Sequence, residues 1–88
     1  METVVDADAI RSIRIELGKR IRTLRKKQGL TQAALGEIAK LDRTYIVGIE
    51  KGKRNVSVES LIKISTGLGV RLSELFLNVD ANVFEDAK

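Results

Sequence analysis

Residues 32–51 read QAALGEIAKLDRTYIVGIEK, with apolar and polar residues at helical spacing. Thr31 stands directly before this stretch and Asp42 divides it. Both residue types cap helix N-termini, because a short side-chain oxygen can accept a hydrogen bond from a backbone amide of the first turn. The sequence therefore predicts one helix from Gln32 to Ala39, a tight turn, and a second helix over residues 43–51.

The two predicted helices share an apolar inner face, and the second helix has a more polar outer face. The inner positions are Leu35, Ile38, Ala39, Leu41, Ile46 and Ile49. The outer stripe consists of Arg43, Thr44, Val47, Gly48 and Lys51. Gly36 lies where the helices approach most closely, and glycine is small enough to fit there. Two short helices in this arrangement form a helix-turn-helix, in which the N-terminal part of the second helix meets base edges.

Apolar residues recur at helical spacing on both sides of this pair. A preceding helix ends before Gly29, with a start between residues 9 and 16 left open, and its apolar face is Ile13, Leu17, Ile21 and Leu24. Ser57 caps a helix over residues 58–68 whose inward positions are Leu61, Ile62, Ile64 and Leu68. Residues 73–77 form a short fifth helix. The prediction is an all-α fold, a compact five-helix bundle.

Composition limits the function classes. A chain of 88 residues holds one domain, and the absence of cysteine and histidine excludes disulfides, thiolate metal sites and the commonest general base. The carboxylates Glu37, Asp42, Glu50 and Glu59 fall on caps and helix surfaces without a Gly-rich phosphate loop. We therefore expect that the protein is not an enzyme and that it has no cofactor and no small-molecule substrate. No apolar run is long enough to span a membrane, and the acidic N-terminus lacks a signal-peptide pattern, so the expected location is the cytoplasm.

Charge divides the chain into regions. The net charge is +4, and residues 11–30 alone carry +7, between mildly acidic ends. A basic block on a small domain is typical of proteins that bind polyanions, although a solvated helix face gives the same pattern. We predict a flexible arm over residues 1–10, the folded domain over residues 11–77, and a tail over residues 78–88. The tail is apolar enough to pack on the core or across a dimer.

Four segments, in order, resemble the Cro/cI-type (XRE) helix-turn-helix family. They are GLTQAAL at 29–35, LDRTYI at 41–46, GIEKGKRN at 48–55 and LGVRLSELF at 68–76. The resemblance covers residues 16–77 and implies a lambda-repressor-like fold. It also implies a transcriptional regulator that binds a pseudo-palindromic operator in double-stranded DNA as a homodimer. Controller proteins of restriction–modification systems look most similar, and an antitoxin, or a phage or plasmid repressor that also binds a protein, is the alternative.

The resemblance assigns roles to individual residues. The base-reading positions are Arg43, Thr44, Val47 and Gly48. The phosphate-binding positions are Gln32, Tyr45, Lys51, Lys53, Arg54 and Asn55. Alternatives stay open for several of them. Arg43 could hold a phosphate instead of a guanine, Val47 could contact a thymine methyl or no base, and Tyr45 could be a partly buried aromatic. Gln32 could simply be an exposed residue at a helix start.

The same family pattern implies structural roles. Arg25 and Glu50 form a partly buried ion pair between the first and third predicted helices. The dimer surface comprises Leu72, Leu75, Phe76 and Val79. Lys40 stands in the turn where the family favours a glycine with positive φ. If the backbone there is left-handed, lysine costs about 1–2 kcal/mol, and we predict a higher melting temperature for Lys40→Gly.

Overall fold

Side-chain caps set where helices begin in the computed structural model, which describes residues 6–81. Thr31, Asp42 and Ser57 each accept a hydrogen bond from a backbone amide of the following first turn, as the sequence predicted. The helices that they start are α2 (Gln32–Ala39), α3 (Arg43–Glu50) and α4 (Val58–Leu68). The other two are α1 (Ala7–Lys27) and α5 (Leu72–Leu75). All regular structure in residues 6–81 is helical, which confirms the all-α, five-helix prediction.

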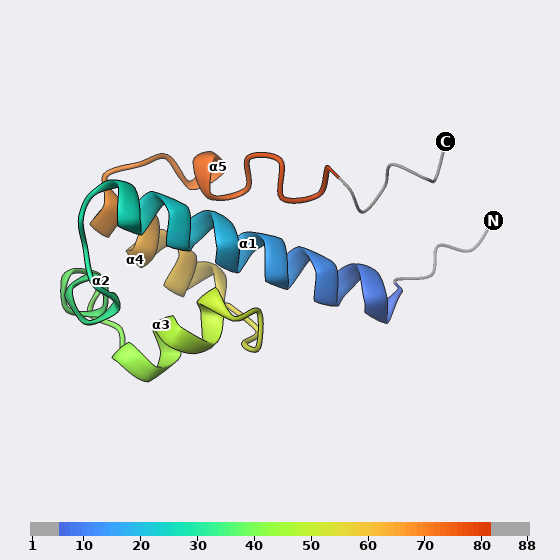
Figure 1. Ribbon diagram of the computed structural model, residues 1–88, viewed down its shortest axis with the longest axis horizontal. Coiled ribbons are helices and arrows are strands. Elements are labelled where there is room, and N and C mark those ends of the chain that lie inside the picture. The colour runs from blue at the N-terminus through green and yellow to red at the C-terminus, as the bar shows by residue number, and fades with distance from the viewer. Residues whose placement is uncertain (1–5, 82–88) are drawn as a thin grey trace.

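The first helix begins earlier than predicted. Asp6 caps α1 by accepting a hydrogen bond from the Asp8 amide at 2.8 Å, so residues 7–10 are helical and do not belong to a flexible arm. The remainder of the predicted arm, residues 1–5, lies outside the described residues. Figure 1 shows α1 crossing the molecule, with its N-terminal end projecting beyond α3 and α4.

The core is aliphatic and lies where α1 and α2 pack against α3 and α4. Its members are Leu17, Ile21, Leu24, Leu35, Ala39, Ile46, Ile49, Leu61, Ile64, Leu68, Leu75 and Val79. Ile38 and Ile62 were predicted to face inward, but they are 51% and 49% exposed. They line an open cleft of about 280 Å³ between α2 and α4 instead, because no third element in residues 6–81 covers that side.

A glycine permits the close contact between α1 and α3. A Cβ atom on Gly18 would overlap the carbonyl oxygen of Ile49 and lie 2.7 Å from that of Glu50. These are backbone atoms of α3, which cannot move aside as a flexible side chain can. Gly18 interrupts the helical pattern in the sequence, and the structure explains it as the contact point of two helices.

The turn between α2 and α3 has the predicted shape. Lys40 adopts the left-handed conformation, with φ 57° and ψ 45°. The Leu41 amide donates to the Gly36 carbonyl at 2.8 Å, which closes the C-terminus of α2. A Cβ atom on Gly36 would lie 2.7 Å from the Leu41 carbonyl oxygen. The turn therefore requires glycine at position 36, and it holds Lys40 in a conformation that costs energy.

The C-terminal segment corrects the predicted dimer surface. Leu75 is fully buried and Val79 is 3% exposed, because both pack into the core of their own protomer. They are therefore unavailable to a partner, whereas Leu72 and Phe76 are 38% and 40% exposed. The fifth helix ends at Leu75 instead of residue 77. Residues 82–88 of the predicted tail lie outside the described residues.

Candidate nucleic-acid interface

The outer flank of α3 is accessible. Arg43 and Thr44 are exposed in its first turn, and Val47 and Gly48 are half-buried further along the same flank. The inner flank carries buried Ile46. Figure 1 shows α3 at the edge of the molecule, with one side clear of the other helices. A helix held by its apolar face with polar residues at its exposed N-terminal end has the geometry needed to enter a major groove.

A buried ion pair fixes α3 against α1. Arg25 donates to the two carboxylate oxygens of Glu50, from Nε to Oε2 at 2.6 Å and from Nη2 to Oε1 at 2.9 Å. Only 8% and 3% of the two side chains are exposed. Arg25 Nη1 also donates to the Leu30 carbonyl at 2.7 Å. The hydrogen bond to Glu50 raises the pKa of Arg25 and outweighs the effect of burial, which lowers it. The ion pair implied by the resemblance is therefore present.

Gln32 links α2 to the same pair. Its Nε2 atom donates to Glu50 Oε1 at 3.2 Å, and the residue is half-buried. The side chain thus braces α3 from the first turn of α2. Gln32 also stands at the N-terminus of α2, where free backbone amides favour a phosphate. A phosphate contact by Gln32 therefore stays a prediction.

The loop after α3 is cationic. Its exposed polar members are Lys51, Lys53, Arg54 and Asn55. The Arg54 guanidinium lies 5.7 Å from the centre of the Tyr45 ring. A Cβ atom on Gly48 would lie 2.6 Å from Arg54 Cγ. The Arg54 side chain therefore covers Gly48, which the sequence analysis named as a base-reading position. Sequence reasoning missed this contact, because it depends on how the loop folds back over α3.

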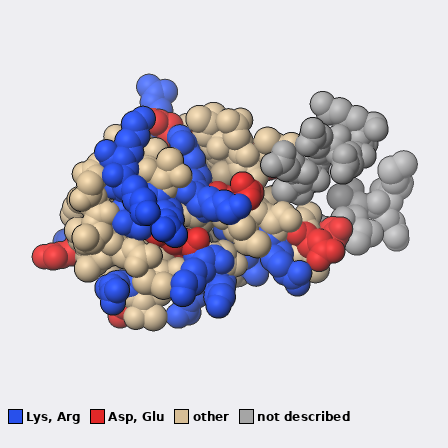
Figure 2. All heavy atoms as spheres, viewed as in Figure 1, with Lys and Arg blue, Asp and Glu red and all other residues tan. Residues whose placement is uncertain are grey.

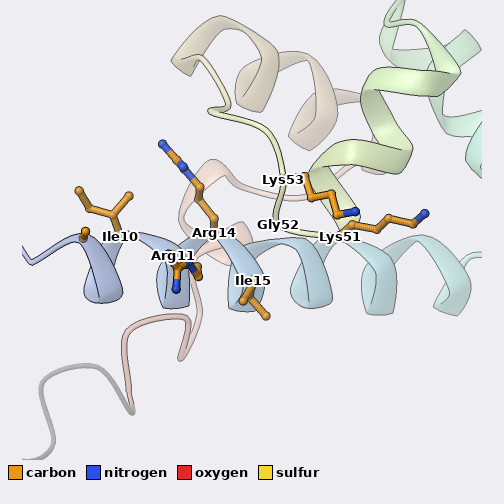
Figure 3. Close-up of a pocket in the computed structure, with 8 residues that line it drawn as sticks. Ile10, Arg11, Arg14, Ile15, Lys51, Gly52 and Lys53 are labelled. Atoms are coloured by element: carbon orange, nitrogen blue, oxygen red, sulfur yellow. The ribbon is translucent and has the colours of Figure 1, made fainter.

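Part of the positive charge forms a row along one edge of the molecule. Figure 2 shows Lys and Arg side chains along the lower edge of the view, from α3 past the loop that follows it to the N-terminal half of α1. The row includes a cleft of about 620 Å³ between that half of α1 and the loop (Figure 3). Four cations line the cleft: Arg11, Arg14, Lys51 and Lys53. The basic block in the sequence indicated charge near Arg11 and Arg14, but gave no reason to place them beside the loop.

Two findings concern other classes of site. In residues 6–81, no group of three or more Asp, Glu, His or Cys side chains is arranged to hold a metal ion. No helix in that range combines the length and apolar composition that a membrane crossing needs. Three of the four carboxylates considered in the sequence have other contacts: Asp42 caps α3, Glu50 pairs with Arg25, and Glu59 pairs with Lys63 at 3.6 Å.

Comparisons with known proteins agree with this geometry. The helix-turn-helix family HTH_3 matches residues 21–75. Control protein C.MunI from a Mycoplasma species is 49% identical over 69 residues, which cover 77% of this chain and 93% of that protein. Control protein C.BamHI from Bacillus amyloliquefaciens is 42% identical over 65 residues, covering 73% of this chain and 80% of that protein. The crystal structure of the restriction–modification controller protein C.AhdI from Aeromonas hydrophila matches with a TM-score of 0.71 and 39% identity, covering 81% of this chain and all of that one.

Proposed function

This chain belongs to the helix-turn-helix family, and we propose that it is a sequence-specific DNA-binding transcriptional regulator that binds a pseudo-palindromic operator as a homodimer. The observation that carries the proposal is the exposed flank of α3, with Arg43 and Thr44 at its N-terminal end. Arg43 donates to guanine in the major groove, and Thr44 and Val47 contact the neighbouring bases. The proposed site of action is the cytoplasm.

Phosphate contacts on both sides position α3 in the groove. Gln32 binds at the N-terminus of α2, and the loop residues Lys51, Lys53, Arg54 and Asn55 bind beyond the C-terminus of α3. Tyr45 lies beneath Arg54 and orients it, and its hydroxyl contacts the strand. These contacts supply affinity that depends on salt, whereas the α3 flank supplies preference among sequences.

The regulatory role that we propose is that of a controller of a restriction–modification system. The support is the likeness to C.MunI and C.BamHI over most of their lengths, together with the C.AhdI structure. A selection of bound fragments from random duplexes tests the function. We expect an inverted repeat whose half-sites lie about one helical turn, ~34 Å, apart. Failure to enrich any sequence would contradict the proposal.

The proposed dimer surface is the exposed apolar patch of Leu72, Phe76 and Leu77, the last 56% exposed. A two-fold arrangement brings the same patch of both protomers together and sets the distance between the two α3 helices. Sedimentation of the double variant Leu72→Glu/Phe76→Glu tests it, since four buried carboxylates would repel each other. We expect a monomer, with Ile62→Glu remaining dimeric as an exposed apolar control on α4. An unchanged dimer in the double variant would place the interface elsewhere.

A further inference from the structure

The cleft between α1 and the loop after α3 gathers cations from two distant parts of the chain. Arg11 and Arg14 come from the second and third turns of α1, and Lys51 and Lys53 come from the loop. In Figure 3, Arg14 rises from α1 on the side where the loop lies, although its end points away from the ends of Lys51 and Lys53. A Cβ atom on Gly52 would lie 2.8 Å from the Ile15 Cα atom, so the loop rests directly on α1. The four cations are therefore carried by two segments that pack directly against each other.

Little negative charge opposes these cations. Arg11 pairs with Asp8 at 3.6 Å, but the two side chains are 71% and 82% exposed, and such pairs contribute little. Among residues 6–81, no ion-pair partner within 4.0 Å is found for Arg14, Lys51 or Lys53. The lining of the cleft is therefore net positive, and it attracts an anion. Arginine and lysine both form charge-assisted hydrogen bonds to phosphate oxygens.

The position of the cleft indicates which phosphate it meets. Lys51 is the C-cap of α3, so the cleft continues the surface that flanks the proposed groove-binding helix. Counting from Gly18, where α1 touches α3, Arg14 and Arg11 lie about 6 and 10 Å further along the helix axis. That reach corresponds to roughly two or three nucleotides along a DNA strand. Arg11 and Arg14 also lie outside residues 21–75, which match the helix-turn-helix family.

We propose that Arg14, assisted by Arg11, binds the DNA backbone outside the half-site, with the flanking phosphate seated in the cleft beside Lys51 and Lys53. The projecting half of α1 thereby extends the footprint of this chain beyond that of its helix-turn-helix. The inference rests on the proposed function, because it assigns further contacts to the same DNA. It adds affinity without base preference.

The test compares Arg14→Ala with wild type on two duplexes that carry the selected operator. One duplex has several flanking base pairs on each side, and the other ends at the half-sites. Binding is measured between about 50 and 200 mM salt. On the long duplex, Arg14→Ala should lower the slope of log affinity against log salt by about 0.9 for each protomer. On the short duplex it should match wild type, and Arg14→Lys should keep the wild-type slope on both.

Arg22→Ala is the matched control, because Arg22 is exposed on the same helix but does not line the cleft. It should match wild type on both duplexes. The inference is overturned if Arg14→Ala has the wild-type slope on the long duplex, or if its slope falls equally on both duplexes. An equal fall of the slope in Arg22→Ala would also overturn it. Thermal unfolding of each variant confirms that it is folded.

A free anion is the other source of phosphate, and calorimetry with inorganic pyrophosphate distinguishes it. We expect no saturable binding at micromolar concentrations. Saturable binding that Arg14→Ala removes would assign the cleft to a small ligand and overturn the DNA assignment. The proposed function fails separately, if wild type itself prefers no sequence in the random-duplex selection.

Discussion

The Arg25 guanidinium donates two hydrogen bonds to the Glu50 carboxylate, at 2.6 and 2.9 Å, although the two residues are 25 positions apart in the sequence. The pair joins α1 to the C-terminal end of α3, and Gln32 adds a third bond to Glu50 from α2. Three helices thus meet at one buried carboxylate. Because α3 presents the proposed base-reading side chains, this junction sets the orientation of the flank that enters the groove.

Arg25→Ala should lower the free energy of unfolding by about 3–5 kcal/mol, because Glu50 would remain buried without its partner. Urea unfolding measures the loss. The double variant Arg25→Met/Glu50→Leu should recover most of it, since neither charge is then left in the core. A loss in Arg25→Ala no larger than that of an exposed residue would contradict the structural role of the pair.

Gly18→Ala should destabilise the protein by about 1–3 kcal/mol, although alanine is the better helix former. The added methyl group would collide with the carbonyl oxygens of Ile49 and Glu50, and α1 would have to move away from α3. Lys19→Ala is the neighbouring control, since Lys19 is exposed and should change stability by less than about 0.5 kcal/mol. Equal stability of Gly18→Ala and wild type would mean that the two helices are further apart.

Lys40→Gly should stabilise the protein by about 1 kcal/mol and raise Tm by about 4–8 °C. The reason is the left-handed backbone at φ 57°, which glycine adopts without the clash of a Cβ atom. Lys40→Ala keeps the Cβ atom and should leave Tm close to that of wild type. Scanning calorimetry of the two variants separates backbone strain from loss of the lysine side chain, and a lower Tm in Lys40→Gly would refute the strain.

Arg54→Ala should weaken DNA binding without altering base preference. Arg54 is exposed in the cationic loop and packs over Tyr45, which suits a phosphate contact. The slope of log affinity against log salt should fall by about 0.9 for each protomer. A changed consensus in the selected duplexes would instead show that Arg54 reads a base across Gly48, whose outer side it covers.

Local features of this fold were predictable from sequence because they depend on neighbouring residues. Thr31, Asp42 and Ser57 cap the helices that follow them, since a cap needs only its own first turn. The left-handed Lys40 followed from its place in the turn, through the family resemblance. The apolar periodicity of α1 likewise placed Leu17, Ile21 and Leu24 in the core.

Features that depend on distant packing were missed. Ile38 and Ile62 have the spacing of inward-facing residues but are exposed, because no third element in residues 6–81 covers them. Leu75 and Val79 were assigned to the dimer surface but are buried in the core of their own protomer. The site shows the same limit. The family pattern named the residues of α3 and its loop, whereas the placement of Arg14 beside that loop arises only when α1 packs across α3.

The most direct test of groove entry by α3 is the base preference of Arg43→Ala in a selection from random duplexes, alongside wild type. Arg43 is exposed in the first turn of α3, where a bidentate contact to guanine is worth about 1–3 kcal/mol of discrimination. We expect one guanine position in each half-site to lose its preference while the other positions keep theirs. A consensus identical to that of wild type would contradict base reading by Arg43 at the N-terminal end of α3.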